Sequence, residues 1–390
     1  MERPASMLAC ANRELGAAVV AALDATAGST PRLFYAPGRV NLIGEHVDYC
    51  GGPALPMPID RGVYVAARLR DDGAVRLRAL DAPEGWERYP RAVLEVFADA
   101  TGCRGGLEVA AGGDVPIGAG LSSSAALSVA VAVALDALHA TRLPASELAR
   151  IAHRAEVEHV GVPCGIMDQY ASALGRAGQA LWLHGGLVGA WEHVTLPDDL
   201  SVLVMDTKTR RQLAGSDAGY AARVRQCAAA LQTIEQRVGA RGALARCSLE
   251  DLVQAQPSLP DLQRRRARHV ITETARVGAA VTALRRRDLA ALGALLDASH
   301  ASGRDDHQVS CAELDAITVA ARAVPGVFGA RFVGAGFGGC AIALVRPDAV
   351  AATQRAVAAD YAARFGITPD FALARSGAGA GERRFARPLT

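Results

Sequence analysis

Lysine is almost absent from this chain of 390 residues. Lys208 is the only lysine, and arginine and histidine supply the other basic side chains. A Walker-type phosphate loop places a lysine on the phosphates of a nucleotide, and its pattern GxxxxGK does not occur here. If this chain binds a nucleotide phosphate, it must therefore do so with a different kind of phosphate-binding loop.

A surplus of one charge is also lacking. Lysine plus arginine number 42 and aspartate plus glutamate number 40, so the formal net charge is +2. Such a balance produces no field strong enough to steer a nucleic acid or an anionic membrane. We expect neither as a partner.

Long apolar runs and paired cysteines are missing too. The longest apolar stretch, residues 125–138, is too short for a bilayer span and contains Ser128 and Asp136. The first twenty residues lack the basic-then-apolar layout of a secretory signal. Eight scattered cysteines without a CxxC pair argue against a zinc site and a disulfide framework, and favour reduced core thiols. The cytoplasm is the expected compartment.

Hydrophobic residues make up 51% of the chain, which at this length is enough for about two domains. Apolar residues alternate with polar ones as in strands exposed on one face, and elsewhere they recur with the helical period. The expected strands are 63–69, 75–80, 107–111 and 202–205, and the expected helices are 122–143, 145–160, 167–174, 220–238, 262–287 and 289–300.

The pattern changes near residues 196–200, where we place a domain junction that divides the chain into 1–197 and 198–390. Strands are followed by blocks of helices, without strict βαβ alternation. This order predicts an α+β fold rather than a doubly wound sheet.

The stretch PIGAGLSSSAA, residues 116–126, joins a predicted strand to a predicted long helix. Its glycines let backbone N–H groups approach an anion, and the helix N-terminus adds partial positive charge. The serine hydroxyls are further donors and can also ligate Mg²⁺. A tight turn uses the same residues, so this stretch alone leaves both interpretations open.

A second glycine-rich run, VGAGFGGCAIAL at residues 333–344, lies between two short apolar segments. The apolar run after it has the character of a strand, which predicts a tight hairpin. A dinucleotide fingerprint requires a helix at that point. NAD binding is therefore disfavoured.

Six polar side chains crowd one glycine-bracketed loop: Arg39, Asn41, Glu45, His46, Asp48 and Tyr49. A solvated loop is one interpretation. The apolar neighbours, among them Leu42, Ile43 and Leu55, instead indicate a buried segment, in which polar groups need partners. The hydroxyls of a sugar would supply them.

Asp168 stands among apolar residues at the predicted start of a helix. It could be an N-cap, or a base that accepts a hydroxyl proton or holds that hydroxyl for attack on a γ-phosphate. Glu156 and Glu158 lie on the preceding helix, where either could be a metal ligand or part of a solvated face.

Together these residues resemble the galactokinase family, part of the wider superfamily of galacto-, homoserine, mevalonate and phosphomevalonate kinases. The most specific likeness is GRVNLIGEHVDYCGG at 38–52, GAGLSSSAA is similar to the superfamily's phosphate loop, and GAGFGGC is similar to its third motif. PCGIMDQY, SDAGY, RARH and RDDHQVSC extend the likeness over nearly the whole chain.

The resemblance implies a two-domain α+β fold of the GHMP-kinase type, with a sugar- and ATP-binding first domain and the active site in the inter-domain cleft. It implies galactose and ATP as small-molecule substrates, Mg²⁺ as the metal and a monomer as the favoured state. Carried over residue by residue, the catalytic pair is Asp168 and Arg39, and the galactose contacts are Glu45, His46, Asp48, Gly165 and Tyr220. The triphosphate loop comprises Gly118, Ala119, Gly120, Leu121, Ser122, Ser123 and Ser124, and the Mg²⁺ positions are Ser124 and Glu156. Asp168 could remove the proton of the anomeric hydroxyl or only orient that hydroxyl.

Several positions depart from the family pattern. Val47 replaces a usual Thr, and Cys50 a usual Asn, as in the related N-acetylgalactosamine kinases. Those relatives do not share the Pro-Cys-Gly at 163–165, so galactose is preferred over N-acetylgalactosamine or arabinose. A sensor of sugar and ATP without catalysis is a second alternative, although Ser122 to Ser124 and Asp168 are all present. Gly303 and His307 replace what are more often Leu and Tyr.

Overall fold

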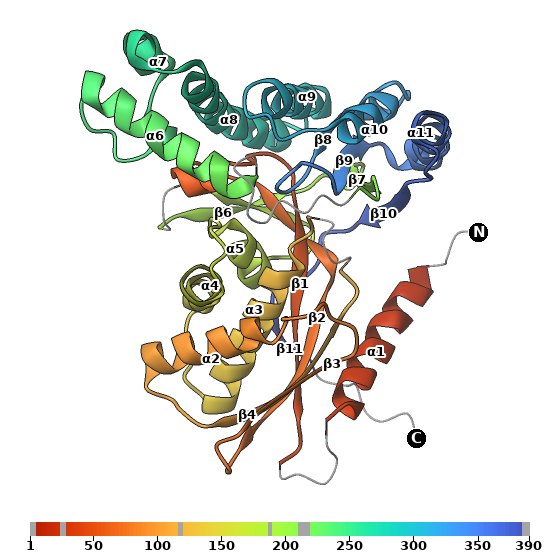
Figure 1. Cartoon of the computed structure of the whole chain (residues 1–390). Coiled ribbons are helices and arrows are strands. Elements are labelled where there is room, and N and C mark those ends of the chain that lie inside the picture. Colours follow the sequence, from red (N-terminus) through yellow and green to blue (C-terminus); the bar gives the residue numbers. More distant parts are fainter. Residues whose placement is uncertain (1–4, 24–28, 116–119, 186–188, 210–218, 384–390) are drawn as a thin grey trace.

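The computed structural model describes residues 5–23, 29–115, 120–185, 189–209 and 219–383. Gly118 and Ala119 of the predicted phosphate loop lie outside this described part. The fold is α+β, as predicted, with two larger sheets that each carry a layer of helices (Figure 1). In the described part, no helix is both long and apolar enough to cross a membrane.

The first sheet has five strands and lies in the lower half of Figure 1. In sheet order they are β11 (Gly381–Arg383), β1 (Arg32–Asn41), β2 (Pro56–Arg70), β4 (Gly106–Gly113) and β3 (Val75–Ala79). All neighbours are antiparallel except β3 and β4, which pair in parallel. The C-terminal strand β11 thus completes the sheet that the N-terminal half begins.

Helices cover both faces of this sheet. One face holds α2 (Arg88–Thr101), α3 (Ser123–His139), α4 (Ala145–Arg154) and α5 (Met167–Leu174), and the other holds α1 (Ala5–Ala21) (Figure 1). Alternate residues of β2 accordingly enter two cores: Val63 and Val65 pack with α3, and Tyr64 and Ala66 pack on the side of α1. The alternation predicted a strand correctly, but the face that we expected to be exposed is covered by a helix.

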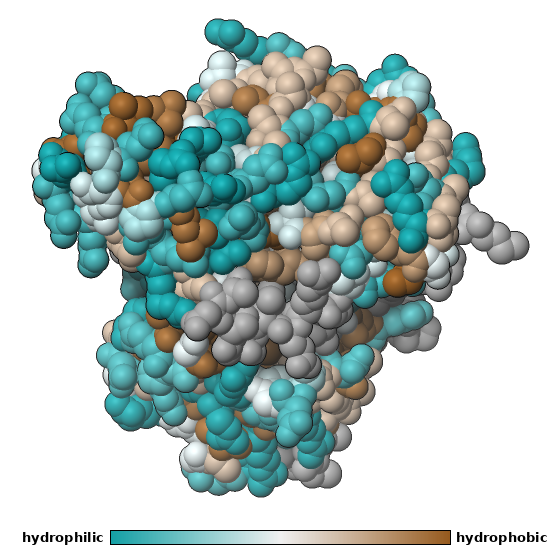
Figure 2. Space-filling model, turned by 45° about the horizontal axis from the view of Figure 1, so that its top comes forward, coloured by the Kyte–Doolittle hydropathy of each residue, from teal (hydrophilic) through white to brown (hydrophobic). Residues whose placement is uncertain are grey.

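The second sheet has four antiparallel strands, in the order β10 (Asp370–Ala374), β7 (Ser201–Asp206), β9 (Cys340–Val345) and β8 (Val327–Phe332). Around it lie α6 (Tyr220–Val238), α7 (Leu249–Ala255), α8 (Asp261–Arg285), α9 (Leu289–Asp305), α10 (Ala312–Arg322) and α11 (Val350–Phe365). A two-stranded hairpin of β5 (Gln179–Leu183) and β6 (Trp191–Thr195) stands between the halves. Figure 2 shows hydrophobic residues of the helical layer in small separate groups, one of them at the end that carries α6 and α7.

The loop after β1 is buried between the two halves. Leu42, Ile43 and Leu55 are 0% exposed and belong to one core cluster with Val204 of β7 and Ile342 of β9. Complete burial of such a side chain contributes about 1.5–3 kcal/mol, so these residues hold the loop inside the molecule. The interpretation of the polar loop as a buried segment is confirmed.

Three helices differ clearly from their expected ends. The helix expected over 122–143 stops at His139, because Ala140 adopts a left-handed conformation with φ of 55°. The helix expected over 145–160 is α4 followed by a π-helical turn, η2 (Ala155–Val160). The helix expected to end at His300 continues to Asp305 through Gly303. A Cβ on Gly303 would stand 2.3 Å from the Phe332 ring, so glycine at this position allows the helix to lie close to β8.

Candidate active site

The residues predicted to bind the substrates line one cavity of about 780 Å³. They come from both halves of the chain: β1 and the loop after it, the start of α3, the segment before α5, the start of α6, and the turn after β8. Its lining includes Arg39, Glu45, His46, Asp48, Gly120 to Ser124, Gly165, Asp168 and Tyr220. The structure therefore brings together residues that are far apart in the sequence, from Arg39 to Ala335.

Arg39 and Asp168 form an ion pair inside this cavity. Nε of Arg39 lies 2.7 Å from Oδ1 of Asp168, and Nη2 lies 2.8 Å from Oδ2. Arg39 is directed there by a register shift in the pairing of β1 with β2 between Pro37 and Arg39. The Arg39 side chain is 6% exposed and that of Asp168 is 28% exposed, so the carboxylate faces the cavity while the guanidinium is buried behind it.

Ser122 provides a third donor to Asp168. Its hydroxyl donates to Oδ2, the oxygen that also accepts from Arg39. Ser122 caps α3 with φ of 62°, a left-handed conformation that non-glycine residues rarely adopt. Such backbone strain gathers at functional sites. Asp168 is thus fixed in orientation by partners from β1 and from the phosphate loop.

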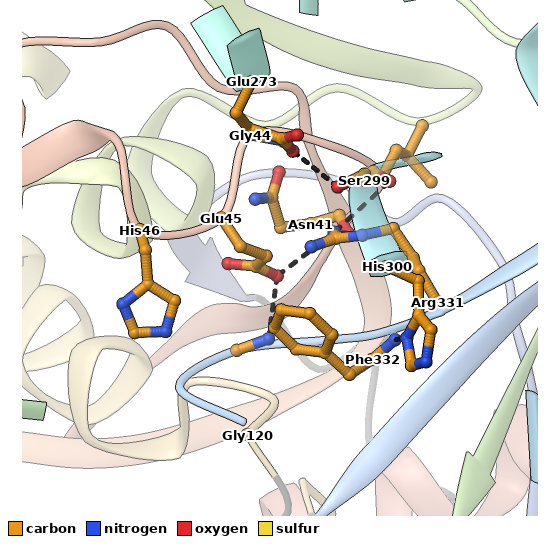
Figure 3. Close-up of polar contacts among 12 residues, drawn as sticks. Asn41, Gly44, Glu45, His46, Gly120, Glu273, Ser299, His300, Arg331 and Phe332 are labelled. Atoms are coloured by element: carbon orange, nitrogen blue, oxygen red, sulfur yellow. Dashed lines mark hydrogen bonds and ion pairs between the residues drawn. The ribbon is translucent and has the colours of Figure 1, made fainter. Parts of the chain in front are cut away.

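Glu45 is almost completely buried at 2% exposure, with one oxygen engaged by the protein (Figure 3). Oε1 accepts from the backbone N–H of Gly334 at 2.8 Å and lies 3.4 Å from Nη1 of Arg331. Burial raises the pKa of Glu45, and the charges of Arg331 and Arg39 oppose that shift. The second oxygen lies on the side of the carboxylate toward His46 (Figure 3).

His46 has both ring nitrogens bonded to protein. Nε2 lies 3.0 Å from the carbonyl oxygen of Ala335, and Nδ1 lies 3.0 Å from the Tyr49 hydroxyl. Burial lowers the pKa of His46 to about 3, so the ring is neutral and carries one proton. A carbonyl only accepts, so that proton is on Nε2, and Nδ1 accepts from Tyr49. His46 therefore presents ring carbons, rather than a free nitrogen, to the cavity.

The Tyr49 hydroxyl also forms a hydrogen bond with His307. The Tyr49 oxygen lies 3.1 Å from Nε2 of His307, and because its one proton goes to His46, it accepts from this nitrogen. Burial lowers the pKa of His307 well below its ordinary value, so Nδ1 is bare. Nδ1 has no hydrogen-bond partner within the described residues. The histidine in place of the family's more usual tyrosine thus donates to Tyr49.

Asp48 and Gly165 are in direct contact at the wall of the cavity. A Cβ on Gly165 would lie 1.9 Å from Oδ2 of Asp48, so no other residue fits at 165 without displacing the carboxylate. Burial, reinforced by the charge of Asp168, raises the pKa of Asp48 to about 7. The ring of Tyr220 lies nearby, 5.3 Å from that of His46.

A second cavity, of about 650 Å³, adjoins the first and shares Ser123 and Ser124 with it. Its other lining residues include Trp86, Arg88, Tyr89, Asp114 and Leu127. The N-terminus of α3, a seventeen-residue helix, lies between the two cavities. Its unpaired N–H groups and positive dipole end favour an anion at that point.

The two glycine-rich runs meet beside the first cavity. A Cβ on Gly334 would lie 3.0 Å from the Gly120 oxygen, and one on Gly120 would lie 3.2 Å from the Val333 oxygen. The run 333–344 does form a hairpin between β8 and β9, as predicted. Its turn also holds the loop after β1, through the bonds of Gly334 to Glu45 and of Ala335 to His46.

Three family descriptions match the chain: the galactokinase galactose-binding signature at residues 23–69, the GHMP kinases N terminal domain at 88–176 and the GHMP kinases C terminal at 280–363. A galactokinase from Roseiflexus sp. (strain RS-1) is 39% identical over 360 residues, which are 89% of this chain and 91% of that protein. One from Chloroflexus aurantiacus is 40% identical over 375 residues, 92% and 95% of the two chains. The chain belongs to the galactokinase family.

A galactokinase from Lactococcus lactis, whose crystal structure is complexed with galactose, has the same fold with a TM-score of 0.88. It is 32% identical, and the superposition covers 97% of this chain and all of that one. The mevalonate kinase of L. major, complexed with R-mevalonate, matches with a TM-score of 0.60 at 22% identity over 89% of this chain and 95% of that one, which indicates the fold alone. The galactokinase-family membership inferred from the motifs is confirmed.

Glu156 and Glu158, which local sequence left equivalent, differ in this member of the galactokinase family. Glu156 is 3% exposed, accepts from Gln169 at 2.9 Å, and has its pKa raised to about 7 by burial. Glu158 is 49% exposed and pairs with Arg154 along the helix. Of these two glutamates, only Glu156 is a buried carboxylate.

Sequence reasoning missed several residues of this galactokinase-family site. Trp86 and Tyr89 lie in the second cavity, but two aromatic residues at the start of a helix carry no signal that separates a ligand contact from ordinary core packing. Arg331 and Ala335 hold Glu45 and His46 from the other half of the chain. Ala335 lies within the third motif and Arg331 shortly before it, and only these positions in the sequence pointed toward them.

Proposed function

We propose that this chain transfers the γ-phosphoryl group of ATP to the anomeric hydroxyl of α-D-galactose, giving α-D-galactose 1-phosphate and ADP. The observation that carries the proposal is Asp168, held by Arg39 and Ser122, in a cavity that adjoins a second cavity at the N-terminus of α3. One cavity suits a polyhydroxylated acceptor and the other a nucleotide. The point of transfer would then lie between them, at the serines that line both cavities.

Galactose would lie in the first cavity. Glu45 and Asp48 offer carboxylate oxygens to its hydroxyls, the Gly165 backbone and the Tyr220 hydroxyl offer further polar atoms, and the ring carbons of His46 pack against it. A site built on hydroxyl partners rejects an analogue that lacks one of them far more strongly than a hydrophobic pocket does. Such a site supports a sugar substrate with defined hydroxyl geometry.

Asp168 would act on the anomeric hydroxyl. The sugar oxygen forms a bond to the γ-phosphorus while the bond from that phosphorus to the bridging oxygen breaks, and ADP leaves with the electron pair. Either the proton goes to Asp168 during transfer, or the carboxylate only orients the hydroxyl and the sugar oxygen loses its proton after it has bonded to phosphorus. Arg39, buried and cationic, would stabilise the negative charge that moves between nucleotide and sugar.

ATP would lie in the second cavity, with Trp86 and Tyr89 beside the base and the phosphates at Gly120 to Ser124. Backbone N–H groups and serine hydroxyls take the place of a phosphate-binding lysine. The only lysine of the chain forms an ion pair with Asp370 at 3.1 Å.

Ser124 and Glu156 would hold Mg²⁺. Hydroxyl and carboxylate oxygens are the hard donors that this ion prefers, and the buried charge of Glu156 gains a counter-charge from it. In the described part, no group of three or more His, Cys, Asp or Glu forms a metal cage. That suits Mg²⁺, which takes its other ligands from phosphates and water. When bound, the ion neutralises charge on the phosphates.

The same proposal includes the division into domains at 197/198, a cytoplasmic location and a monomeric state. Five cysteines, Cys50, Cys103, Cys164, Cys227 and Cys247, are free thiols, as a reducing compartment favours. Light scattering of the purified chain tests the monomeric state.

An ADP-release assay with ATP and Mg²⁺ over galactose, glucose, N-acetylgalactosamine and arabinose tests the function. We expect the highest kcat/KM for galactose. An equal or higher value for the acetylated sugar would reject galactose as the preferred substrate. Binding of galactose and ATP without any ADP release would favour the sensor instead.

A further inference from the structure

Arg331 is a buried cation behind the acceptor cavity. It belongs to β8, is 0% exposed and does not line the cavity. Nη1 lies 3.2 Å from the backbone oxygen of Asn41, 3.4 Å from that of Leu42 and 3.4 Å from Oε1 of Glu45 (Figure 3). Glu45 forms an ion pair with this guanidinium, so the two charges compensate each other in the interior.

The remaining donors of Arg331 are poorly satisfied. Nε and Nη2 have no hydrogen-bond partner within the described residues, and the side-chain amide of Asn41 beside it is unpartnered as well. A buried cation with two orphan donors is costly unless an opposite charge is close. The ion pair with Glu45 therefore helps to keep Arg331 in place, together with a contact to the Phe332 ring at 5.0 Å.

Glu45 is surrounded by charged and titratable groups from four elements. They are Arg39 on β1, Asp48 on η1 (Asp48–Cys50), Arg331 on β8, and His269 and Glu273 on α8, besides the neighbouring His46. Arg39 is already paired with Asp168, and Glu273 is paired with Arg276 at 2.7 Å. Within the described residues Arg331 forms an ion pair with Glu45 alone, whereas Arg39 is already paired with Asp168.

We propose that Arg331 is a positioning residue for the acceptor sugar: it pairs with Glu45 and holds one carboxylate oxygen, so that the other faces the sugar hydroxyls. The proposal rests on the proposed function through Glu45 as a sugar contact. It assigns to the strand before the third motif a role in sugar affinity. The backbone N–H of Gly334, three residues further on, donates a hydrogen bond to the same oxygen.

The first test compares Arg331→Gln and Arg331→Lys with the wild type in steady-state assays from pH 6 to 9. Loss of the positive charge raises the pKa of Glu45 further, so a smaller fraction of the molecules offers an ionised acceptor to the sugar at neutral pH. We expect the galactose KM of R331Q to rise about tenfold or more at pH 7, with a much smaller change in kcat, and to fall again as the pH is raised. R331K retains the charge and should keep the pH profile of the wild type.

Arg322→Gln is the matched control. Arg322 also lies beside β8, with Nε 2.6 Å from Oδ1 of Asp297, outside both cavities. Its loss should lower stability without altering the pH profile of the galactose KM. A rise in KM for R331Q that is the same at every pH, as for a purely structural defect, would overturn the proposal.

The second test is a double-mutant cycle of thermal unfolding, which needs no substrate. R331Q leaves a buried carboxylate unpaired, and Glu45→Gln leaves a buried guanidinium unpaired, so each single variant should lower Tm. The double variant removes both charges and should lose less than the sum of the two single losses. Additive losses, or failure of the double variant to fold when E45Q folds, would refute the pairing.

The two tests separate this inference from the proposed function. If the wild type fails to phosphorylate galactose, the proposed function is wrong, and the unfolding cycle still reports on the Arg331 and Glu45 pair. If the wild type is active and the cycle is additive, only the inference fails.

Discussion

The guanidinium of Arg39 donates a hydrogen bond to each carboxylate oxygen of Asp168, at 2.7 Å and 2.8 Å. A planar, two-pronged contact of this kind fixes the carboxylate in rotation as well as in distance. Asp168 therefore faces the acceptor cavity in one orientation before any substrate binds. The two residues are 129 positions apart in the chain.

Asp168→Asn keeps the size of the side chain and removes its charge. We expect kcat to fall by about 10²–10⁴, the usual contribution of a positioned general base, with little change in the galactose KM. Single-turnover kinetics at saturating ATP measure the effect. A variant with full turnover would exclude the base role, and a loss of only a few-fold would favour orientation of the hydroxyl.

Gly165→Ala should damage sugar binding, since its Cβ would lie 1.9 Å from Oδ2 of Asp48 and displace that carboxylate. We expect the galactose KM to rise about tenfold or more while the ATP KM stays unchanged. Gly278→Ala on α8 is the control, because a Cβ there meets nothing within 4 Å. It should preserve both KM values and stabilise the helix by about 0.5–1 kcal/mol.

Asp48→Asn should show that ionisation of the Asp48 carboxyl lowers the stability of the folded state. Burial raises the pKa of Asp48 from 3.8 to about 7, so the folded state holds this proton more tightly than the unfolded state. A carboxyl shifted upward contributes stability at low pH and loses it as the pH rises toward 7. The amide has no such loss, so Tm of D48N should exceed that of the wild type at pH 8, and the gap should shrink toward pH 5.

The same ionisation should appear in the function of the wild type. If the sugar needs the carboxylate form of Asp48, the galactose KM of the wild type rises as the pH falls below about 7.

Asp99→Asn is the control for the stability measurement on D48N, because the Asp99 side chain is 60% exposed and forms only a surface ion pair. A Tm difference for D48N that is constant between pH 5 and pH 8 would contradict the raised pKa.

Glu156→Gln tests the metal position. We expect the Mg²⁺ concentration needed for half-maximal activity to rise about tenfold or more, with little change in the galactose KM. Glu158→Gln, two residues away on the solvated side, should leave the Mg²⁺ requirement as it is. Equal effects of the two substitutions would argue against Glu156 as a ligand.

Trp86→Ala tests the second cavity as the nucleotide site. Loss of an aromatic face against the base should raise the ATP KM about tenfold, as stacking of that kind contributes on the order of 1.5 kcal/mol. The galactose KM should not change. Isothermal titration with a non-hydrolysable ATP analogue measures the affinity directly, and an unchanged value would place the nucleotide elsewhere.

The sequence by itself determined much of the local structure and the chemistry on offer. Helical periodicity located the helix over 220–238 at its observed ends, and alternation located the strands around 63–69 and 75–80. The apolar neighbours of Glu45 correctly predicted that the polar loop is buried. These features depend on residues near one another in the chain, so a periodic pattern is enough to reveal them.

Only the tertiary structure decided which side chains meet. Nothing in the sequence pairs Glu45 with Arg331, 286 positions away, or opposes Gly120 to Gly334. It also separated the buried Glu156 from the exposed Glu158, and occupied both nitrogens of His46 with protein partners. The physical reason is that ionisation and hydrogen bonding depend on burial and on distances between atoms, which arise when the two halves of the chain pack around the loop after β1.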